Sequence, residues 1–342
     1  MMAAGNGPGG SLPRRADLDA AKGLAIILVV LGHLVSRPHP AGNDWYLYLQ
    51  TALYQFHMPF LMYLSGYVHS LSGAARTPAP AWPRFVLRRG LRLLVPFGAF
   101  GLAVIVGKLV VSQFISVDNP PASFVSGVVD LVWHTDHSPA LSVWYMAVLF
   151  TVSELTPPLL WVARGHVAVL VAVSVAAYLV HVPHVMFLDR VARFALFFVT
   201  GVLVAGAGTA ATEAMRRFSL LSLAVFLALL AACTALFDDF TDAARLALCG
   251  LASIPALHGL IIGSSLGRSR WLLVAGGYSF VIYLLNTPFI GAAKGLLLKV
   301  TSWDGPIFPL FAAVLFSAGL LGPVFVKRLL LPARSFLDRI TD

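Results

Sequence analysis

The sequence predicts an all-α polytopic membrane protein with about ten transmembrane helices and both termini in the cytoplasm. Composition supplies the first two observations behind this prediction. Of the 342 residues, 58% are hydrophobic and only 11% are charged, whereas ordinary soluble domains contain about 25% charged residues. A soluble protein of this size would need far more polar surface to cover its core. The composition therefore excludes a soluble enzyme, a disordered chain and a nucleic-acid-binding domain.

The third observation is the recurrence of apolar segments near the ~20 residues that a bilayer core requires. Backbone polar groups inside a bilayer must be satisfied internally, so we expect these segments to be helices. The fourth and fifth segments are close enough together to form a broken pair. The expected spans are residues 20–36, 46–71, 92–114, 141–162, 167–184, 191–209, 219–237, 244–263, 271–293 and 307–328.

The positions of the basic residues predict the orientation of these spans. With the N-terminus in the cytoplasm, 16 of the 24 Lys and Arg residues fall in cytoplasmic segments and 6 fall in outer segments, while Lys22 and Lys108 lie within spans. Cytoplasmic loops of membrane proteins carry the excess of basic residues, so this ratio favours both ends inside and an even number of spans. The expected location is the cytoplasmic membrane, and the net charge of +9 requires no nucleic-acid partner.

A single transmembrane domain is expected over residues 14–332. Residues 1–13 are rich in glycine and are expected to form a disordered tail, and residues 333–342 a short cytoplasmic tail. Cys233 and Cys249 lie in apolar stretches and form neither a disulfide framework nor a metal-ligand spacing. The sequence contains no metal-ligand cluster, Gly-rich nucleotide fingerprint or serine nucleophile elbow.

The first span carries two ionisable residues, Lys22 and His33. They are eleven residues apart, which places them on one face of a helix with about 16 Å of rise between them. Asp19 precedes Lys22 by three residues, so the two side chains can pair. Ionisable residues within a span usually face a cavity, and histidine is the common general base near neutral pH. We therefore consider His33 a candidate catalytic base.

A structural role can also explain Lys22 and His33, without any part in catalysis. His33 can hydrogen-bond a neighbouring helix, and Lys22 can extend its ammonium group to the membrane interface. The sequence by itself leaves both interpretations open.

Four further motifs follow along the chain. They are Phe56-His57-Met58-Pro59-Phe60 with Ser65-Gly66-Tyr67, the basic run Arg84 to Arg92 ending in Leu93-Leu94-Val95-Pro96, Val143-Trp144-Tyr145, and Gly277-Tyr278-Ser279-Phe280-Val281-Ile282-Tyr283-Leu284. The first span contributes the remaining motif, in which ten residues separate the basic residue Lys22 from His33. In this order the five motifs resemble acyltransferase family 3 membrane proteins, and within them the fucose 4-O-acetylase-like group. The resemblance covers about residues 15–330.

The resemblance implies an O-acyltransferase that takes an acetyl group from acetyl-coenzyme A, whose phosphates stay in the cytoplasm. Arg88, Arg89 and Arg92 cluster at the cytoplasmic mouth of the third span, and arginine binds phosphate well. The positive-inside tendency explains these residues too. The implied acceptor is a hydroxyl of an extracytoplasmic polysaccharide, lipid-linked glycan or glycolipid. Succinyl is the alternative to acetyl.

One position departs from the family pattern. Relatives often carry histidine three residues after Tyr283, where this chain has Asn286. Asparagine can donate and accept hydrogen bonds but cannot carry a proton near neutral pH. We therefore assign Asn286 no acid–base role and consider it a substrate-binding candidate together with Tyr283.

Other candidates lie along the second and fourth spans. His57 is near the middle of the second span, where Pro59 is expected to kink the helix and open space beside it. Ser65 follows in the inner half, as a wall of the donor site or as a small residue for helix packing. Trp144 and Tyr145 are expected at the outer end of the fourth span, on the acceptor side or as interfacial aromatic residues.

Two charged residues complete the set. Glu154 lies within the fourth span, where an unpaired carboxylate is costly, and Lys108 is a conceivable partner. Arg193 begins the sixth span and can hold a sugar or a carboxylate. Like Asp19, Glu154 is expected to have a structural or coupling role.

The predicted reaction starts from an acyl-coenzyme A whose pantetheine arm passes Lys22 and reaches His33. His33 takes the proton of an acceptor hydroxyl, which attacks the thioester carbonyl. Asn286, Tyr283 or His57 would donate to the oxyanion, and a covalent acyl-histidine is a variant. The competing class is a transporter of a polysaccharide or solute, although neither repeats nor paired broken helices are evident. A passive scaffold gives no reason for two ionisable residues to share a face.

Overall fold

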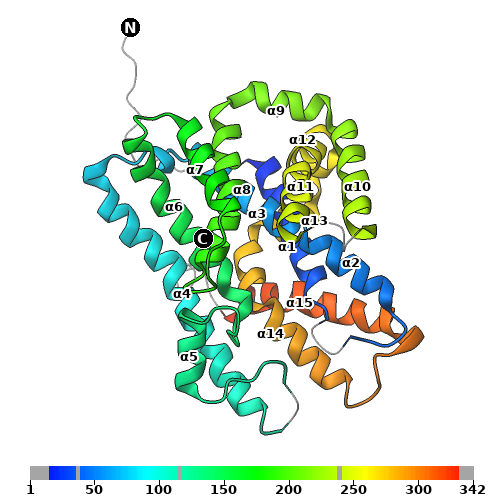
Figure 1. The fold of residues 1–342 in the computed structure, drawn as a ribbon. Coiled ribbons are helices and arrows are strands. Elements are labelled where there is room, and N and C mark those ends of the chain that lie inside the picture. Colours follow the sequence, from blue (N-terminus) through cyan, green and yellow to red (C-terminus); the bar gives the residue numbers. More distant parts are fainter. Residues whose placement is uncertain (1–14, 36–38, 115–116, 237–240, 331–342) are drawn as a thin grey trace.

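The computed structural model describes residues 15–35, 39–114, 117–236 and 241–330. Over these residues the secondary structure is helical, apart from one isolated backbone bridge between His134 and Val185. The expected all-α class is therefore confirmed, and Figure 1 shows the helices as one bundle. The tails predicted at residues 1–13 and 333–342 lie outside the described residues.

The helices occur in the following order. The first half contains α1 (Ala16–Gly32), α2 (Asp44–Tyr54), α3 (His57–Leu71), α4 (Trp82–Val111), α5 (Phe124–Val132), α6 (Trp144–Val162) and α7 (Val167–Leu179). The second half contains α8 (Leu188–Gly206), α9 (Gly208–Arg217), α10 (Ser219–Ala235), α11 (Asp242–Ser253), α12 (Gly259–Gly263), α13 (Arg270–Gly277), α14 (Ser279–Leu297) and α15 (Phe308–Leu330). A π-helical turn (Ile254–His258) joins α11 to α12, and short 3₁₀ turns lie at Ala74–Arg76, Ala79–Ala81, Leu141–Val143, Ser265–Arg268 and Gly305–Ile307.

Membrane crossing is supported by fewer helices than the sequence predicts. In the described part of the chain, five helices are long and apolar enough to span a bilayer, or up to six if one pair bent by 105° counts as a single span. The five are Ala79–Val111, Leu141–Val162, Asp242–Gly263, Ser279–Leu297 and Gly305–Leu329, and the bent pair is α8 with α9. The protein is thus a membrane protein, while ten spans and cytoplasmic termini stay predictions.

The first helix lies at the centre of the bundle, where it contacts α2, α3, α13, α14 and α15. Two glycines allow its closest approach, to α13. A Cβ atom on Gly23 would lie 2.0 Å from the carbonyl oxygen of Leu272, and one on Gly276 would lie 1.9 Å from that of Asp19. This central position brings the residues of the first motif into contact with several other helices.

The second expected span is broken rather than kinked at its proline. Helix α2 ends at Tyr54, and α3 begins at His57 after a turn at Gln55 and Phe56. Pro59 lies in the first turn of α3, where a backbone N–H has no partner within the helix in any case. The expectation of a kink centred on Pro59 is therefore wrong, because the chain already breaks before it.

The bundle has two ends, which we name after the residues of α1. Helix α1 begins at the Lys22 end and finishes at the His33 end. Arg15, just before α1, lies 5.9 Å from the Tyr67 ring in the last part of α3, and His69 of α3 lies 5.9 Å from Phe85 near the start of α4. The Lys22 end therefore holds the start of α4, and also the finish of α6, since the rings of Trp82 and Trp161 lie 5.9 Å apart. The His33 end holds the starts of α6 and α8. In Figure 1, α5 and α9 lie on opposite sides of the molecule, at the His33 end and the Lys22 end respectively.

Candidate functional site

His33 lies one residue beyond the end of α1, where α2 packs across the helix terminus. The amide of Gln50 donates to the carbonyls of Gly32 (2.8 Å) and Val35 (2.9 Å), and the hydroxyl of Tyr54 donates to the Gly32 carbonyl at 3.0 Å. The last carbonyls of a helix have no partners within it, so these side chains fix the backbone that carries His33. Gln50 and Tyr54 were not among the candidates named from the sequence, although a polar glutamine within an apolar segment indicates a buried hydrogen-bonding role.

Asn286 holds the imidazole of His33. Its Oδ1 atom lies 2.8 Å from His33 Nδ1, and its Nδ2 group donates to the carbonyls of Ile282 (2.9 Å) and Tyr283 (2.8 Å) one turn earlier in α14. Because both N–H groups of the amide are used by its own helix, the oxygen faces His33 and accepts a hydrogen bond from Nδ1–H. The Nε2 atom of His33 then carries the lone pair and has no hydrogen-bond partner among the described residues.

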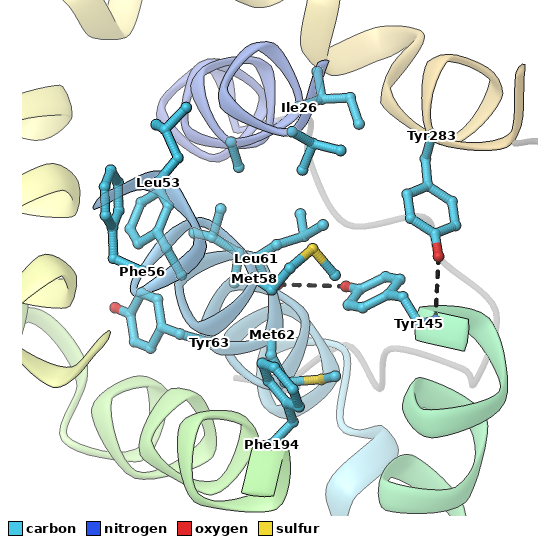
Figure 2. Packing of buried hydrophobic residues seen from close by; sticks show 14 of the residues in the cluster. Ile26, Leu53, Phe56, Met58, Leu61, Met62, Tyr63, Tyr145, Phe194 and Tyr283 are labelled. Carbon is cyan, nitrogen blue, oxygen red and sulfur yellow. Dashed lines mark hydrogen bonds between the residues drawn. The ribbon is translucent and has the colours of Figure 1, made fainter. Parts of the chain in front are cut away.

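Tyr283 connects this pair to the start of α6. Its hydroxyl donates to the carbonyl of Ser142 and accepts from the backbone N–H of Tyr145 at 3.1 Å. The hydroxyl of Tyr145 in turn lies 2.5 Å from Ser65 Oγ in α3. Figure 2 shows Tyr145 between α3 and Tyr283. The structure therefore brings together Ser65, Tyr145, Tyr283 and Asn286, which sequence analysis had named separately.

Trp144 is covered by an arginine that the sequence did not single out. The guanidinium of Arg190 lies 5.0 Å from the centre of the Trp144 ring and 5.6 Å from that of Phe187. Phe194, one turn further along α8, lies 4.8 Å from the same indole. The N–H groups of Arg190 donate to no side chain or carbonyl in the described part of the chain, and the charge lies within electrostatic range of the Tyr283 hydroxyl. Arg190 is thus an available cation beside the tyrosine network.

Glu154 pairs with a different residue from the one expected. Its carboxylate lies 3.8 Å from Nε of Arg89, which also donates to Ser153 Oγ at 2.6 Å. The proposed partner Lys108 instead donates to the carbonyl of Asp118 at 2.6 Å. Lys108 was the wrong choice because it lies in the last turn of α4, whereas Arg89 lies in the half of α4 that contacts α6.

The basic cluster at the start of α4 is divided between two faces. Arg88 and Arg92 are four residues apart and are exposed on one side of the helix. Arg89 is turned into the bundle, where its side chain is only 23% exposed. The three arginines therefore do not form a single surface patch for phosphate. Arg88 and Arg92 form the accessible pair.

Lys22 and Asp19 form the expected ion pair, with Lys22 Nζ 3.7 Å from Asp19 Oδ1. Asp19 also lines a cleft of about 660 Å³ between α1, α13 and α15 at the Lys22 end. Arg270, Tyr278 and Lys327 line the same cleft. A second group of basic residues therefore stands next to the first motif.

His57 is buried at the start of α3, and its Nδ1 atom lies 2.6 Å from the carbonyl of Leu53. That carbonyl can only accept a hydrogen bond, so Nδ1 carries the N–H and Nε2 is an acceptor. The donor groups of Asn286 and Tyr283 are committed to backbone carbonyls as well. The three residues expected to donate to an oxyanion therefore have no spare proton in this arrangement, in contrast to Arg190.

Arg193 does not face this network. It lines a separate cavity of about 170 Å³ with Tyr178, His184 and Asp189. Within the described residues, no group of three or more His, Cys, Asp or Glu side chains is arranged to hold a metal ion.

This arrangement can perform proton transfer and group transfer at the His33 end. An oriented imidazole provides a base, a nearby guanidinium provides positive charge, and serine and tyrosine hydroxyls line the route from α3 to α14. Basic side chains at the Lys22 end provide two places for an anionic ligand.

Comparison with known proteins gives relatives of this chain. Two curated relatives, each named "Nodulation protein NolL", are 36% identical over 94 residues in Mesorhizobium japonicum and 39% identical over 89 residues in Sinorhizobium fredii. The first alignment covers 27% of this chain and 24% of the relative, and the second covers 25% and 23%. The matched segments are thus about a quarter of each relative's length. No solved structure matches the chain.

A family model described as "Acyltransferase domain" matches residues 15–328, which include α1 with His33, the Arg88–Arg92 pair, Tyr145 and α14 with Asn286. This match spans nearly all of the described residues, and it agrees with the resemblance that the five motifs suggested. The chain therefore belongs to acyltransferase family 3.

Proposed function

We propose that this protein transfers an acetyl or other short acyl group from cytoplasmic acyl-coenzyme A to a hydroxyl of an extracytoplasmic glycan or glycolipid, across the cytoplasmic membrane. The observation that carries the proposal is the contact of 2.8 Å between His33 Nδ1 and Asn286 Oδ1. It leaves His33 Nε2 as a proton acceptor at one end of a bundle whose other end is rich in basic residues. Family membership favours group transfer over the transport function that the sequence alone left open.

The reaction needs one base and one electrophilic carbonyl. His33 Nε2 takes the proton of the acceptor hydroxyl while its oxygen forms a bond to the thioester carbon. The tetrahedral intermediate then collapses, the carbon–sulfur bond breaks, and the thiolate leaves with the proton that His33 had taken. The products are an O-acyl ester and free coenzyme A. Direct transfer needs no acyl-histidine, although the same Nε2 atom could form one.

Arg190 is proposed to stabilise the oxyanion. Developing negative charge on the carbonyl oxygen requires hydrogen-bond donors that are already in place. The other candidates have committed their donor groups to carbonyls. The Arg190 guanidinium stacks on the rings of Trp144 and Phe187, within electrostatic range of Asp189 and Asp136, and no hydrogen bond to another described residue uses its N–H groups. Its position beside the tyrosine network supports this role.

The donor is proposed to enter from the Lys22 end. Arg88 and Arg92 would bind its phosphates, since they are exposed and share a helix face. Arg89, Ser65 and Tyr145 would then line the route of the pantetheine arm between α3, α4 and α6. Lys22, next to its partner Asp19, would contact the donor near the start of α1.

The acceptor side is proposed at the His33 end, where Trp144, Tyr145 and Arg190 surround the start of α6. A saccharide fits the combination of aromatic rings and hydroxyl-binding groups found there.

The test is mass spectrometry of surface glycans from cells with the gene, without it, and with the His33→Ala variant. We expect acyl esters only with the unchanged gene, and expression and membrane insertion of the variant at normal levels. Purified protein should release free coenzyme A thiol from acetyl-coenzyme A when an acceptor is supplied. Full activity of the His33→Ala variant would remove His33 from the mechanism.

A further inference from the structure

A second polar cavity lies at the His33 end, beside the start of α8. It has a volume of about 170 Å³ and lies between the end of α7, the first turns of α8 and the start of α11. Tyr178, His181, His184, Asp189, Arg193 and Ala243 are among the residues that line it. None of them belongs to the five motifs that suggested the acyltransferase family, although Arg193 was named separately as a candidate from the sequence.

Asp189 is the central feature of this cavity, because one of its oxygens lacks a partner. The side chain is buried, with the residue 8% exposed, and its Oδ2 atom accepts a hydrogen bond from His184 Nδ1 at 3.0 Å. The Oδ1 atom is buried as well and has no hydrogen-bond partner among the described residues. Buried polar atoms are nearly always satisfied, and burying a carboxylate oxygen without a donor is costly. Asp189 lines the cavity and its side chain is 11% exposed, so a ligand there would meet the carboxylate through that exposed part.

The charges in the cavity select the chemistry of that donor. A carboxylate only accepts hydrogen bonds, and a guanidinium only donates them. Asp189 repels phosphates and carboxylates, and Arg193 repels simple cations. A hydroxyl both donates and accepts, so neighbouring hydroxyls on one ring satisfy both residues together. Asp189 and Arg193 are four residues apart and lie on one face of α8, as two hydroxyl-binding groups must.

An aromatic wall completes the cavity. The hydroxyl of Tyr178 donates to the carbonyl of Ala243 at 2.5 Å, which fixes its ring in place at the end of α7. A fixed aromatic ring offers an apolar surface to the C–H face of a sugar. Small-molecule sites typically combine such a surface with a few placed polar groups.

The cavity and the proposed reaction centre share α8 as a wall. Arg190 and Phe194 face Trp144, whereas Asp189 and Arg193 face the cavity. Successive residues of a helix are rotated by about 100°, so two adjacent residues of one turn serve two different sites. One ligand that passes the end of α8 can therefore contact both.

We infer that this cavity binds a neutral sugar ring, and that it is a subsite for a unit of the acceptor glycan next to the unit that is acylated. The second half of this inference rests on the proposed function, and the first half does not. Asp189 accepts from ring hydroxyls, Arg193 donates to them, and Tyr178 supports the ring.

The test measures sugar binding directly by saturation-transfer NMR, using the full-length protein in nanodiscs. The probes are the methyl glycosides of glucose, galactose, fucose and N-acetylglucosamine, with cyclohexylmethanol as a ring without vicinal hydroxyls. We expect at least one glycoside to bind the unchanged protein and cyclohexylmethanol not to bind. Asp189→Ala and Arg193→Gln should each weaken that binding by about tenfold or more.

The matched control is Asp130→Ala. Asp130 pairs with His134 Nδ1 at 3.2 Å on α5, so this variant removes a second Asp–His pair at the same end of the bundle but outside the cavity. Its glycoside affinity should equal that of the unchanged protein. If Asp189→Ala does not fold, Arg193→Gln decides the comparison. Absence of binding to the unchanged protein, or equal affinity in the cavity variants and the control, overturns the inference.

The His33→Ala variant separates this inference from the proposed function. It should bind the glycoside with unchanged affinity although it transfers no acyl group. If the unchanged protein binds sugar through Asp189 but transfers no acyl group, the sugar-binding inference holds and the proposed reaction is wrong. If the protein transfers acyl groups and neither Asp189→Ala nor Arg193→Gln changes the acceptor KM, the proposed reaction holds and the subsite is wrong.

Discussion

His33 and Asn286 are 253 positions apart in the chain, yet Nδ1 of one lies 2.8 Å from Oδ1 of the other. The contact crosses from the end of α1 to the middle of α14. It determines which nitrogen of His33 carries the proton, because the amide group of Asn286 is fully used by carbonyls of its own helix. Asn286, which does not titrate, thereby determines which nitrogen of the titratable His33 carries the proton.

Replacing Asn286 should lower the rate of transfer and leave substrate binding nearly unchanged. Asn286→Ala removes the acceptor that orients His33, so we expect kcat to fall by about 10- to 100-fold, with the KM of both substrates within about twofold. Asn286→Asp also loses the Nδ2 hydrogen bonds but keeps an acceptor facing His33, so it should recover most of the rate. Equal loss in the two variants would show that helix packing, and not orientation of His33, is the role of Asn286.

Removing the positive charge of Arg190 should reduce the chemical step. For Arg190→Gln we expect kcat to fall by about 10²-fold, which is the usual cost of one oxyanion donor. The matched variant is Arg193→Gln, one turn away on the same helix but facing the sugar cavity, which should change acceptor KM instead. Single-turnover kinetics with saturating substrates separates the two effects. A normal kcat in Arg190→Gln would leave the oxyanion without an assigned donor.

Donor affinity should depend on Arg88 and Arg92. With both changed to Gln, coenzyme A binding measured by isothermal titration should weaken by about tenfold or more at low salt, and less at high salt. The double variant Arg216→Gln/Arg217→Gln removes two basic residues from α9 at the same end and should have no effect. A loss of affinity in Arg270→Gln/Lys327→Gln, with none in Arg88→Gln/Arg92→Gln, would move the phosphates to the cleft beside Asp19.

Breaking the pair between Arg89 and Glu154 should destabilise the protein. Arg89→Gln leaves a buried carboxylate in α6 without its cation, at a cost of about 3 kcal/mol, reduced by the partial exposure of Arg89. The double variant Arg89→Gln/Glu154→Gln should regain most of the thermal stability in detergent. The exposed pair of Arg216 and Glu213 is the control, and its loss should leave the melting temperature nearly unchanged. Additive losses in the double variant would argue against coupling.

The glycine of the second motif should be required for packing. A Cβ on Gly66 would lie 1.9 Å from the carbonyl oxygen of Phe198, so Gly66→Ala must separate α3 from α8. We expect a loss of about 3 kcal/mol or more, seen as a lower melting temperature and reduced expression. Gly98→Ala in α4, where nothing lies within 4 Å of the new Cβ, should be neutral or slightly stabilising. Similar behaviour of the two variants would mean that α3 and α8 can move apart freely.

Composition and local spacing determined the helical class, the membrane location and the pairing of Asp19 with Lys22. These depend on quantities that a sequence contains directly, namely apolar run length and the position of residues on one helix. The same local information made His33 a candidate base but left a packing role open. It could not show that the second span breaks at Gln55, since a turn inside an apolar segment leaves no change in composition.

Only the tertiary structure decided which side chains meet. It paired Glu154 with Arg89 rather than Lys108, turned Arg89 away from Arg88 and Arg92, and placed Arg190 rather than Arg193 against Trp144. The first outcome depends on the position of each residue along α4, and the other two depend on the rotation of a helix about its axis, where about 100° separates successive residues. The sequence by itself determined an apolar helix that leads to His33, and the packing of α1 against α14 decided that Asn286 orients this histidine.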